Sequence, residues 1–359
     1  MHFENYTHDD TFGRHTFDAV GVDLAILNAL RRLILTDVPT VGFRGEASAA
    51  GEPPSVEVLL NDGPLHNEIM QHRIGLLPVH FSEREVDAFN PATDGLTFEL
   101  DVTNHGNGLL DVTTRDIVAK RAGEATAEAA RLFPNDPVTH DAVLITSLRP
   151  GETLRFVATP VKSTPREHAG FTAVSQCTYT FLGDEAAHGD KGPLERERAY
   201  KRNAYGDPTH VQFRLEVENG LSVRYLVDKA FELLAAKVQR ARRGLDEADE
   251  TVVTQAVGAR PEVGSDFTFH QEDDTLGNVL QSLIHNDQVR EPLVPGAAPD
   301  VRFVGYFCPH PLEETVVLRV VPAEKGGDAR GALLQQLERI HRHVEDLRAE
   351  WSEFAPKAR

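Results

Sequence analysis

Three side chains in the first half of the chain are of the types that acid–base chemistry uses, and an arginine stands beside one of them. His72 and Arg73 stand together in the stretch NEIMQHRIGLLPV, and Glu167 and His168 stand together in the stretch REHAGF. Imidazole and carboxylate groups can move protons near neutral pH. One hypothesis is therefore a stand-alone soluble α+β enzyme that uses these four residues and turns over its substrate without a partner protein.

Neighbouring acids suggest a second kind of chemistry, because two-metal enzymes need carboxylates that converge in a cleft. Asp273 and Asp274 are such a pair. They stand where an apolar helical pattern begins, however, and acids at a helix start stabilise its exposed amides. The signatures of nucleophile elbows, zinc proteases, dinucleotide folds and P-loops are missing from the sequence. We expect no catalytic residue, no metal site and no cofactor in this chain.

The composition narrows the function further. The 359 residues include 37 Lys and Arg against 56 Asp and Glu, which gives a formal net charge of −19. A general grip on nucleic acid needs a basic surface, so a regulatory protein that binds DNA directly is a disfavoured alternative. The two cysteines, Cys177 and Cys308, cannot build a disulfide framework or a Cys-rich zinc site. No signal peptide or membrane span is recognisable, and we expect a reducing, intracellular location.

Consecutive arginines mark the first of two similar helical patterns. VDLAILNALRRLILTD, residues 22–37, places apolar side chains on one face and Arg31 and Arg32 on another, with Asp23 as the expected N-cap. DDTLGNVLQSLIHND repeats this pattern, with Asp274 or Thr275 as the expected cap. Such arginines are usually solvated, but guanidinium groups are also favoured where an interface must bind carboxylates.

The elements around the two helices repeat as well. Strand-like HTFDAV and DFTFHQ precede them, and the short stretches at 41–43 and 304–306 follow them. Each copy then closes with a strand and a long helix, from about Val223 to Arg243 and from about Asp328 to Phe354. The order strand, helix, strand, strand, helix therefore occurs twice, which predicts an α+β fold of two similar modules.

The last helix carries a heptad seam that is about three turns longer than a small domain needs, so it requires a partner helix. The helix from Val223 offers a matching apolar face. We expect the two modules to pair through apolar residues of all four helices, namely Leu27, Leu30, Ile34, Leu226, Leu233, Leu280, Leu283, Leu337, Ile340, Val344 and Leu347.

The first copy is interrupted by about 165 residues of strand-like, turn-rich sequence, which indicates an inserted β-rich domain. Between the copies, GLDEADETVVTQAVGARPEVG is typical of a flexible linker. The expected organisation is a first module at 1–45 and 208–243, an inserted domain at 46–207, a linker at 244–264 and a second module at 265–359. A polar loop at 183–207 and an insertion at 288–300 have no assigned role.

Five stretches of the chain resemble one protein family. NALRRLILTDVPT, NEIMQHRIGLLPV and RPGETLRFVATPVKSTPREHAGFTAVSQCTYTF are similar to the alpha-type subunits of multisubunit RNA polymerases, which are the bacterial alpha amino-terminal domain, the archaeal D subunit and the third subunit of nuclear polymerase II. EDDTLGN, followed by GYFCPHP and a long terminal helix, resembles the small partner, the archaeal L subunit or the eleventh subunit of polymerase II. The resemblance covers nearly the whole chain, and the joined form resembles that of large DNA viruses that encode their own polymerase.

The resemblance implies two alpha-like dimerisation modules paired about a pseudo-twofold axis, with a β-rich domain inserted in the first. It implies a non-catalytic platform of DNA-directed RNA polymerase, on which the two large catalytic subunits assemble together with small subunits. DNA would be met only through the complex, and neither a membrane nor an obligate homodimer is expected. The chain would act at the site of transcription, in the nucleus, in a viral factory or virion, or in the cytoplasm.

The resemblance also assigns an interface with a large subunit. The helix that carries Arg31 and Arg32 stands at that contact in the family, and we assign His72, Arg73, Glu167 and His168 to the same surface. One departure is clear, because many archaeal and eukaryotic members have a Cys-rich metal loop in the inserted domain, where this chain has Cys177 alone. Metal binding is therefore not carried over from the family.

Overall fold

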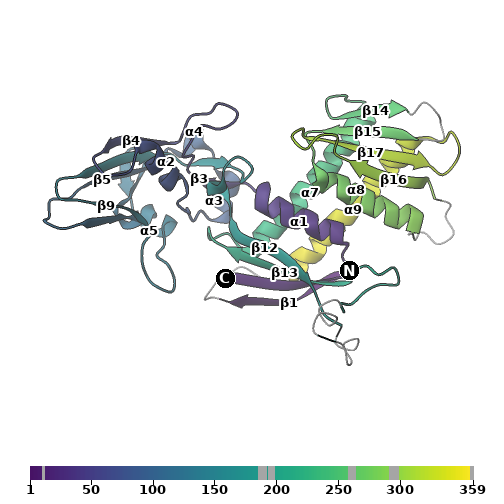
Figure 1. The fold of residues 1–359 in the computed structure, drawn as a ribbon, viewed down its shortest axis with the longest axis horizontal. Coiled ribbons are helices and arrows are strands. Elements are labelled where there is room, and N and C mark those ends of the chain that lie inside the picture. Colours follow the sequence, from purple (N-terminus) through teal and green to yellow (C-terminus); the bar gives the residue numbers. More distant parts are fainter. Residues whose placement is uncertain (10–12, 185–191, 193–198, 258–263, 291–298, 356–359) are drawn as a thin grey trace.

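The computed structural model describes residues 1–9, 13–184, 192, 199–257, 264–290 and 299–355. Two four-stranded antiparallel sheets lie on either side of a group of long helices, and a third, β-rich part lies at the far end of the molecule (Figure 1). The fold is α+β with two similar modules, as the repeated pattern predicts.

The first module consists of one sheet and two helices. Its strands, in sheet order, are β1 (His2–Asp9), β2 (Arg14–Val20), β13 (His210–Val217) and β12 (Val174–Phe181), and its helices are α1 (Leu24–Thr36) and α7 (Val223–Glu247). In β13 the apolar residues Val211, Phe213 and Leu215 are buried and alternate with polar residues. This period of two turns one face of the sheet toward the helices.

The second module has the same topology. Its strands, in sheet order, are β14 (Val253–Val257), β15 (Ser265–His270), β17 (Thr315–Pro322) and β16 (Val301–Phe307), and its helices are α8 (Asp274–Ile284) and α9 (Ala329–Phe354). A π-helical turn, η5 (His285–Arg290), extends α8. The order edge strand, strand before the short helix, strand before the long helix, edge strand is thus the same in both sheets.

The structure corrects the strand that follows the first short helix. The stretch at 41–43 was expected to match the stretch at 304–306, which lies in β16. Instead β3 (Thr40–Gly42) pairs with β11 (Val161–Ser163) in a separate two-stranded sheet. β12 takes the place that corresponds to β16, beside β13. Residues 174–181, which were assigned to the inserted domain, therefore belong to the sheet of the first module.

The expected linker at 244–264 is also wrong over its described residues. α7 continues to Glu247, and Ala248 ends it in the left-handed conformation. β14 follows and pairs with β15 along its whole length, and it thus forms an edge of the second sheet. Residues 258–263 lie outside the described part of the chain, as do residues 185–191 and 193–198 of the polar loop and 291–298 of the insertion.

The inserted part contains a five-stranded sheet, a two-stranded sheet and short helices. The large sheet has the order β4 (Val56–Asn61), β10 (Thr153–Ala158), β5 (Leu96–Thr103), β7 (Val118–Arg121) and β8 (Glu124–Thr126), and the small one pairs β6 (Leu110–Thr113) with β9 (Leu144–Leu148). The helices are α2 (Asn67–Gly75), α3 (Glu83–Ala88), α4 (Pro91–Asp94) and α5 (Glu128–Leu132). α2 packs against β4 and carries the predicted residues His72 and Arg73.

The long helices α7 and α9 pack along each other, and each reaches the sheet of the other module. α9 contacts β1, and α7 contacts β14. The indole of Trp351, near the end of α9, is fully buried and lies 5.3 Å from the ring of Phe3 and 4.7 Å from that of Phe17, measured between ring centroids. The extra turns of α9 therefore fill the core of the first module. None of the described helices has the length and apolar character that a membrane span requires.

Candidate functional site

The eleven apolar residues predicted at the module interface all lie in one hydrophobic core. Nine of them are buried, and Leu233 and Leu283 are half-buried at its edge. The buried members are Leu27, Leu30, Ile34, Leu226, Leu280, Leu337, Ile340, Val344 and Leu347. The described residues thus contain a continuous core that runs through both modules, with the four helices at its centre.

Each of the short helices, α1 and α8, begins at an aspartate that caps it. Asp23 caps α1 by accepting a hydrogen bond from the backbone N–H of Ala25 at 2.8 Å, and Asp273 caps α8 by accepting one from Thr275 at 2.9 Å. Asp273 stands 250 positions after Asp23, the same offset that separates Asn28 from Asn278 in the repeated pattern. The two caps are therefore equivalent positions of the two modules.

Arg32 reaches the cap of α8 from the other module. Its Nε donates to the Thr275 hydroxyl at 2.8 Å, and its Nη2 lies 3.4 Å from the Asp273 carboxylate. We predicted a solvent-facing Arg32 at an interface with another subunit, but its side chain is only 36% exposed and binds within the chain. Arg31 is half-buried, and its Nε donates to Asn28 on the same helix at 3.1 Å.

Arg166 joins the inserted part to both modules at the same place. Its Nε donates to Asp37, at the end of α1, at 2.9 Å, and its Nη2 lies 3.3 Å from Asp273. A third guanidinium nitrogen lies 3.6 Å from Glu314, in the turn before β17. The hydrogen bond to Asp37 is the main cause that raises the pKa of Arg166, so this cation stays charged at every accessible pH.

The cap and the cations hold Asp273 in its ionised form. Burial alone would raise the pKa of its carboxyl group, but hydrogen bonds from Thr275, the charge of Arg32 and a hydrogen bond from Arg166 outweigh burial and lower the pKa to about 2. Sequence reasoning assigned the cap to Asp274 or Thr275 and missed both Arg166 and Asp37. The repeat itself could have revealed Asp273, because it stands where Asp23 stands in the first copy.

The predicted residues of the inserted part make separate contacts and do not form one catalytic arrangement. Glu167 accepts hydrogen bonds from Arg44 and from Ser163, and Arg44 is buried and also pairs with Glu52 at 2.6 Å. The bond from Arg44 is the main cause that lowers the pKa of Glu167. A carboxylate whose pKa is lowered by a cation is a weaker base, and it is therefore a poor general base.

Arg73 is likewise engaged within the chain. Its guanidinium donates to the backbone carbonyls of Leu144 and Ile145 on β9, at 3.2 and 3.1 Å, and so fastens α2 to the small sheet. Of the four residues of the enzyme hypothesis, Glu167 is thus held by Arg44, Arg73 fastens α2 to β9, and only the two histidines remain. This arrangement gives the stand-alone enzyme no support.

The two histidines do meet, beside Glu46. One carboxylate oxygen of Glu46 lies 3.9 Å from Nε2 of His72, and the other lies 3.9 Å from Nε2 of His168. The donor atoms of all three residues lie within 4.8 Å of one another, a spacing that a metal ion could bridge. In the structure, however, His168 Nδ1 accepts a hydrogen bond from the Gly170 backbone N–H, which places the proton of the neutral ring on Nε2. In this tautomer the Nε2 atom of His168 carries a proton and has no lone pair to offer a metal ion, and at 3.9 Å it lies too far from Glu46 for a hydrogen bond.

Three glycines allow the segments of this cluster to approach so closely. A Cβ atom on Gly170 would collide with the carbonyl oxygen of Gly75, and one on Gly75 would lie 2.8 Å from the backbone nitrogen of Gly45. A Cβ on Gly45 would lie 3.0 Å from the Cα atom of His72. The loop after β3, the end of α2 and the turn η2 (Ala169–Phe171) are therefore packed backbone against backbone, which fixes the predicted histidines in place.

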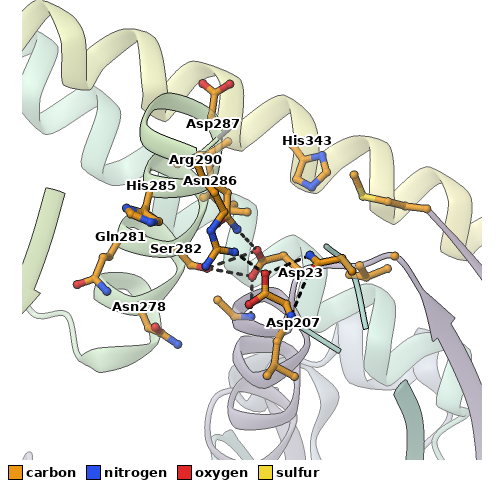
Figure 2. A pocket seen from close by; sticks show the side chains of 18 of the residues that line it. Asp23, Asp207, Asn278, Gln281, Ser282, His285, Asn286, Asp287, Arg290 and His343 are labelled. Atoms are coloured by element: carbon orange, nitrogen blue, oxygen red, sulfur yellow. Dashed lines mark hydrogen bonds and ion pairs between the residues drawn. The ribbon is translucent and has the colours of Figure 1, made fainter. Parts of the chain in front are cut away.

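A cavity of about 670 Å³ opens on the other side of the helix pair, around Asp23 (Figure 2). Its walls come from the start of α1, the end of α8, η5, α9 and the segment at 203–209. Asp23 accepts hydrogen bonds there from Asn286 at 2.7 Å and from Ser282 at 3.2 Å. Arg290 pairs with Asp207, and Arg339 pairs with Asp287 at 2.9 Å.

Comparisons with known proteins identify both halves of the chain. A family model described as the RNA polymerase Rpb3/Rpb11 dimerisation domain matches residues 16–238, and a second model with the same description matches residues 265–350. The first match covers most of the first module together with the inserted part, and the second covers most of the second module without β14. The first match alone spans more than half of the chain.

Curated proteins give the same result. The chain is 31% identical over 186 residues to the DNA-directed RNA polymerases I and III subunit RPAC1 of Bos taurus, and 32% identical over 190 residues to that of Homo sapiens; each alignment covers 47% of this chain and 51% of the relative. It is 27% identical over 181 residues to the DNA-directed RNA polymerases II, IV and V subunit 3 of Arabidopsis thaliana, covering 47% of this chain and 53% of that protein. The chain spans about half the length of the curated relatives it matches.

Proposed function

The chain belongs to the family of RNA polymerase Rpb3/Rpb11 dimerisation domains, and we propose that it is a non-catalytic assembly subunit of a DNA-directed RNA polymerase. The observation that carries the proposal is the presence of two dimerisation modules of the same topology in one chain, paired through a shared core. Relatives named as polymerase subunits support it.

We propose further that the chain is a natural fusion of the two alpha-like partners. In this arrangement each module already has its partner within the chain, so the platform forms without a homodimer. The joined form favours a polymerase of the kind that large DNA viruses encode, with the chain acting at that polymerase's site of transcription. The partners proposed are the two large catalytic subunits and the small subunits that attach to the platform, while DNA is contacted through the complex.

The surface that we propose for a large subunit is a strip of segments, several of which are joined to one another by ion pairs and hydrogen bonds. It runs from Arg31 and Arg32 on α1, through the Arg166 cluster, to the loop with Glu167 and His168 and on to His72 and Arg73 on α2. Because ion pairs and close glycine contacts fix these segments, the strip presents its exposed atoms in a defined arrangement. Pre-ordered surfaces bind with a smaller entropy cost than mobile ones.

Affinity purification of the tagged chain from its native cell tests the proposed function. Co-purification of two large polymerase subunits in near-equal amounts, with template-dependent RNA synthesis by the eluate, is the expected result. An eluate without large subunits would contradict the proposal. Turnover of a small-molecule substrate by the chain purified alone would favour the enzyme hypothesis instead.

A further inference from the structure

The two equivalent caps have different surroundings, although the helices that carry them are related by the repeat. At the cap of α8, Asp273 faces two cations, Arg32 from α1 and Arg166 from the inserted part. At the cap of α1, the position equivalent to Arg32 is Ser282, which offers Asp23 a neutral hydroxyl at 3.2 Å. Asn286 supplies the other hydrogen bond. One cap is thus neutralised by arginines, and the other is bound by neutral groups.

Within the described residues, no cation forms an ion pair with Asp23. Two arginines of the cavity wall are already engaged, because Arg290 pairs with Asp207 and Arg339 pairs with Asp287. His343 also lines the cavity, but burial lowers its pKa despite the opposing influence of Asp23. Among the described residues, the Asp23 carboxylate is therefore bound by neutral hydrogen-bond donors and by no ion pair.

A cavity borders Asp23, whereas Arg166 lies beside Asp273 at the other cap. The cavity of about 670 Å³ is several times larger than an arginine side chain, so it can admit a short stretch of polypeptide. Its wall includes the amide side chains of Asn28, Asn203 and Asn278, which suit peptide groups because amides both donate and accept hydrogen bonds. The ring of Tyr179 also borders the cavity.

We propose that this cavity receives an arginine side chain on an extended segment of another polymerase subunit, and that this arginine pairs with Asp23 as Arg166 pairs with Asp273. A guanidinium group is favoured over an ammonium group because it can bind a carboxylate with its planar fork while stacking on an aromatic ring. Arg290 already lies over the ring of Tyr205 in this way, 5.0 Å from its centroid. The net charge of −19 further favours a basic partner segment.

The identity of the partner as a polymerase subunit rests on the proposed function, whereas the preference of the cavity for arginine does not. A first experiment therefore uses the whole purified chain and a fluorescent peptide with the sequence KSTPREHA, which is residues 162–169 and carries Arg166. A second peptide replaces that arginine by citrulline, which has the same shape and no charge. Binding is measured by fluorescence anisotropy at low salt.

Asp23→Asn and Asp273→Asn form a matched pair of variants, because asparagine caps a helix about as well as aspartate. The arginine peptide is expected to bind wild type and Asp273→Asn alike, and to bind Asp23→Asn at least about tenfold more weakly, as loss of a charge-assisted hydrogen bond implies. The citrulline peptide should bind wild type as weakly as the arginine peptide binds Asp23→Asn. Equal binding of the arginine peptide to wild type and Asp23→Asn, equal binding of the two peptides, or no binding at millimolar concentration would each overturn the proposal.

A second experiment separates this inference from the proposed function. Co-expression of the large subunits with wild type or Asp23→Asn should yield a complex in both cases, with the variant complex dissociating at a lower salt concentration. If both complexes resist salt equally, the arginine site is wrong and the assembly function stands. If wild type recovers no large subunit at all, the proposed function fails, and the peptide result alone decides whether the cavity binds arginine.

Discussion

Single side chains at the helix caps serve two structural roles at once. Asp273 satisfies a backbone N–H of α8 and also holds Arg32 and Arg166, so that one carboxylate connects three segments. A cap alone contributes about 1 kcal/mol. The depressed pKa of Asp273 adds a charge-dependent contribution that an uncharged cap would lack, and this contribution can be measured.

Asp273→Asn should make the stability of the protein less sensitive to acid. The folded-state pKa lies below the ordinary value of 3.8, at about 2, so ionised Asp273 stabilises the fold above pH 4 and loses this effect as pH falls toward 2. The shift corresponds to about 2 kcal/mol in total, of which about half is lost by pH 3. Urea unfolding at pH 6 and pH 3 should therefore show a gap between wild type and variant that narrows at low pH. A gap of constant size would mean that the Asp273 charge is not coupled to folding.

Arg32→Ala should weaken the pairing of the modules slightly, in addition to any effect on assembly. Arg32 binds Thr275 and Asp273 across the interface, but it is partly exposed, and such pairs contribute at most about 1 kcal/mol. Arg31→Ala is the matched control, since the hydrogen bond of Arg31 stays within α1. Thermal melting should show a small loss for Arg32→Ala and less for Arg31→Ala. Recovery of large subunits below both melting temperatures then reports on the interface, and wild-type recovery with both variants would argue against the proposed strip.

At the scale of elements, the terminal helix α9 connects the modules through a seam whose residues differ in depth. Leu337 is completely buried, whereas Ile340 is 4% exposed and borders the cavity near Asp23. Arg342 lies on the outer face, with a side chain that is 67% exposed. A carboxylate introduced at these three positions therefore meets three different environments.

Leu337→Asp is expected to undo the module pairing, because an unpaired buried carboxylate costs several kcal/mol against a total stability of about 5 to 15 kcal/mol. Ile340→Asp should be damaging but milder, since the cavity lets water reach the new carboxylate. Arg342→Asp should be nearly neutral apart from its contact with Glu338. Denaturant unfolding and co-assembly with the large subunits should rank the three variants in this order. A wild-type-like Leu337→Asp would show that the seam is not what holds the modules together.

Trp351→Ala tests whether the extra turns of α9 stabilise the first module. The Trp351 indole contacts Phe3 and Phe17 and donates through Nε1 to the carbonyl of Arg224 at 3.2 Å. Truncating a buried tryptophan costs about 3–5 kcal/mol. Glu350→Ala, one residue earlier on an exposed face, should change stability little. The free energy of unfolding from urea titrations decides the point, and a cost below about 1 kcal/mol would mean that the helix end is dispensable.

Sequence periodicity predicted the helices well and the strand partners poorly, for a physical reason. The 3.6-residue pattern of α1, α8 and α9 is local, so it located these helices to within a few residues. Strand pairing is not local, and nothing in the stretch at 41–43 indicates that it pairs with β11 rather than with the first sheet. β14 was missed because the short stretch 253–257 gains its order from pairing with β15. The site contacts of Arg166 and Glu46 likewise depend on segments that meet only after folding.

At the scale of the whole molecule, each long helix contacts a strand of the other module. α9 fills the core beneath the first sheet, and α7 reaches the edge strand of the second. Arg348 on α9 adds a two-pronged contact with Asp228 on α7, at 2.8 and 3.0 Å. The covalent connection between the modules is therefore one of several connections, and it should not be required once the chain has folded.

Cleavage of a protease site introduced within 258–263 tests this directly, because it separates the chain into fragments that each contain one family match. The fragments are expected to elute together from gel filtration at micromolar concentration. After cleavage the fragments are still joined by the packing of α7 against α9, by the β14–β15 ladder and by the burial of Trp351. The intact connection adds only an effective concentration in the millimolar range. Leu337→Asp in the cleaved protein should release the fragments, which shows that the elution reports on the seam. If the unmutated fragments separate without denaturant, the shared core is too weak to join the modules, and the platform would then depend on the fusion itself.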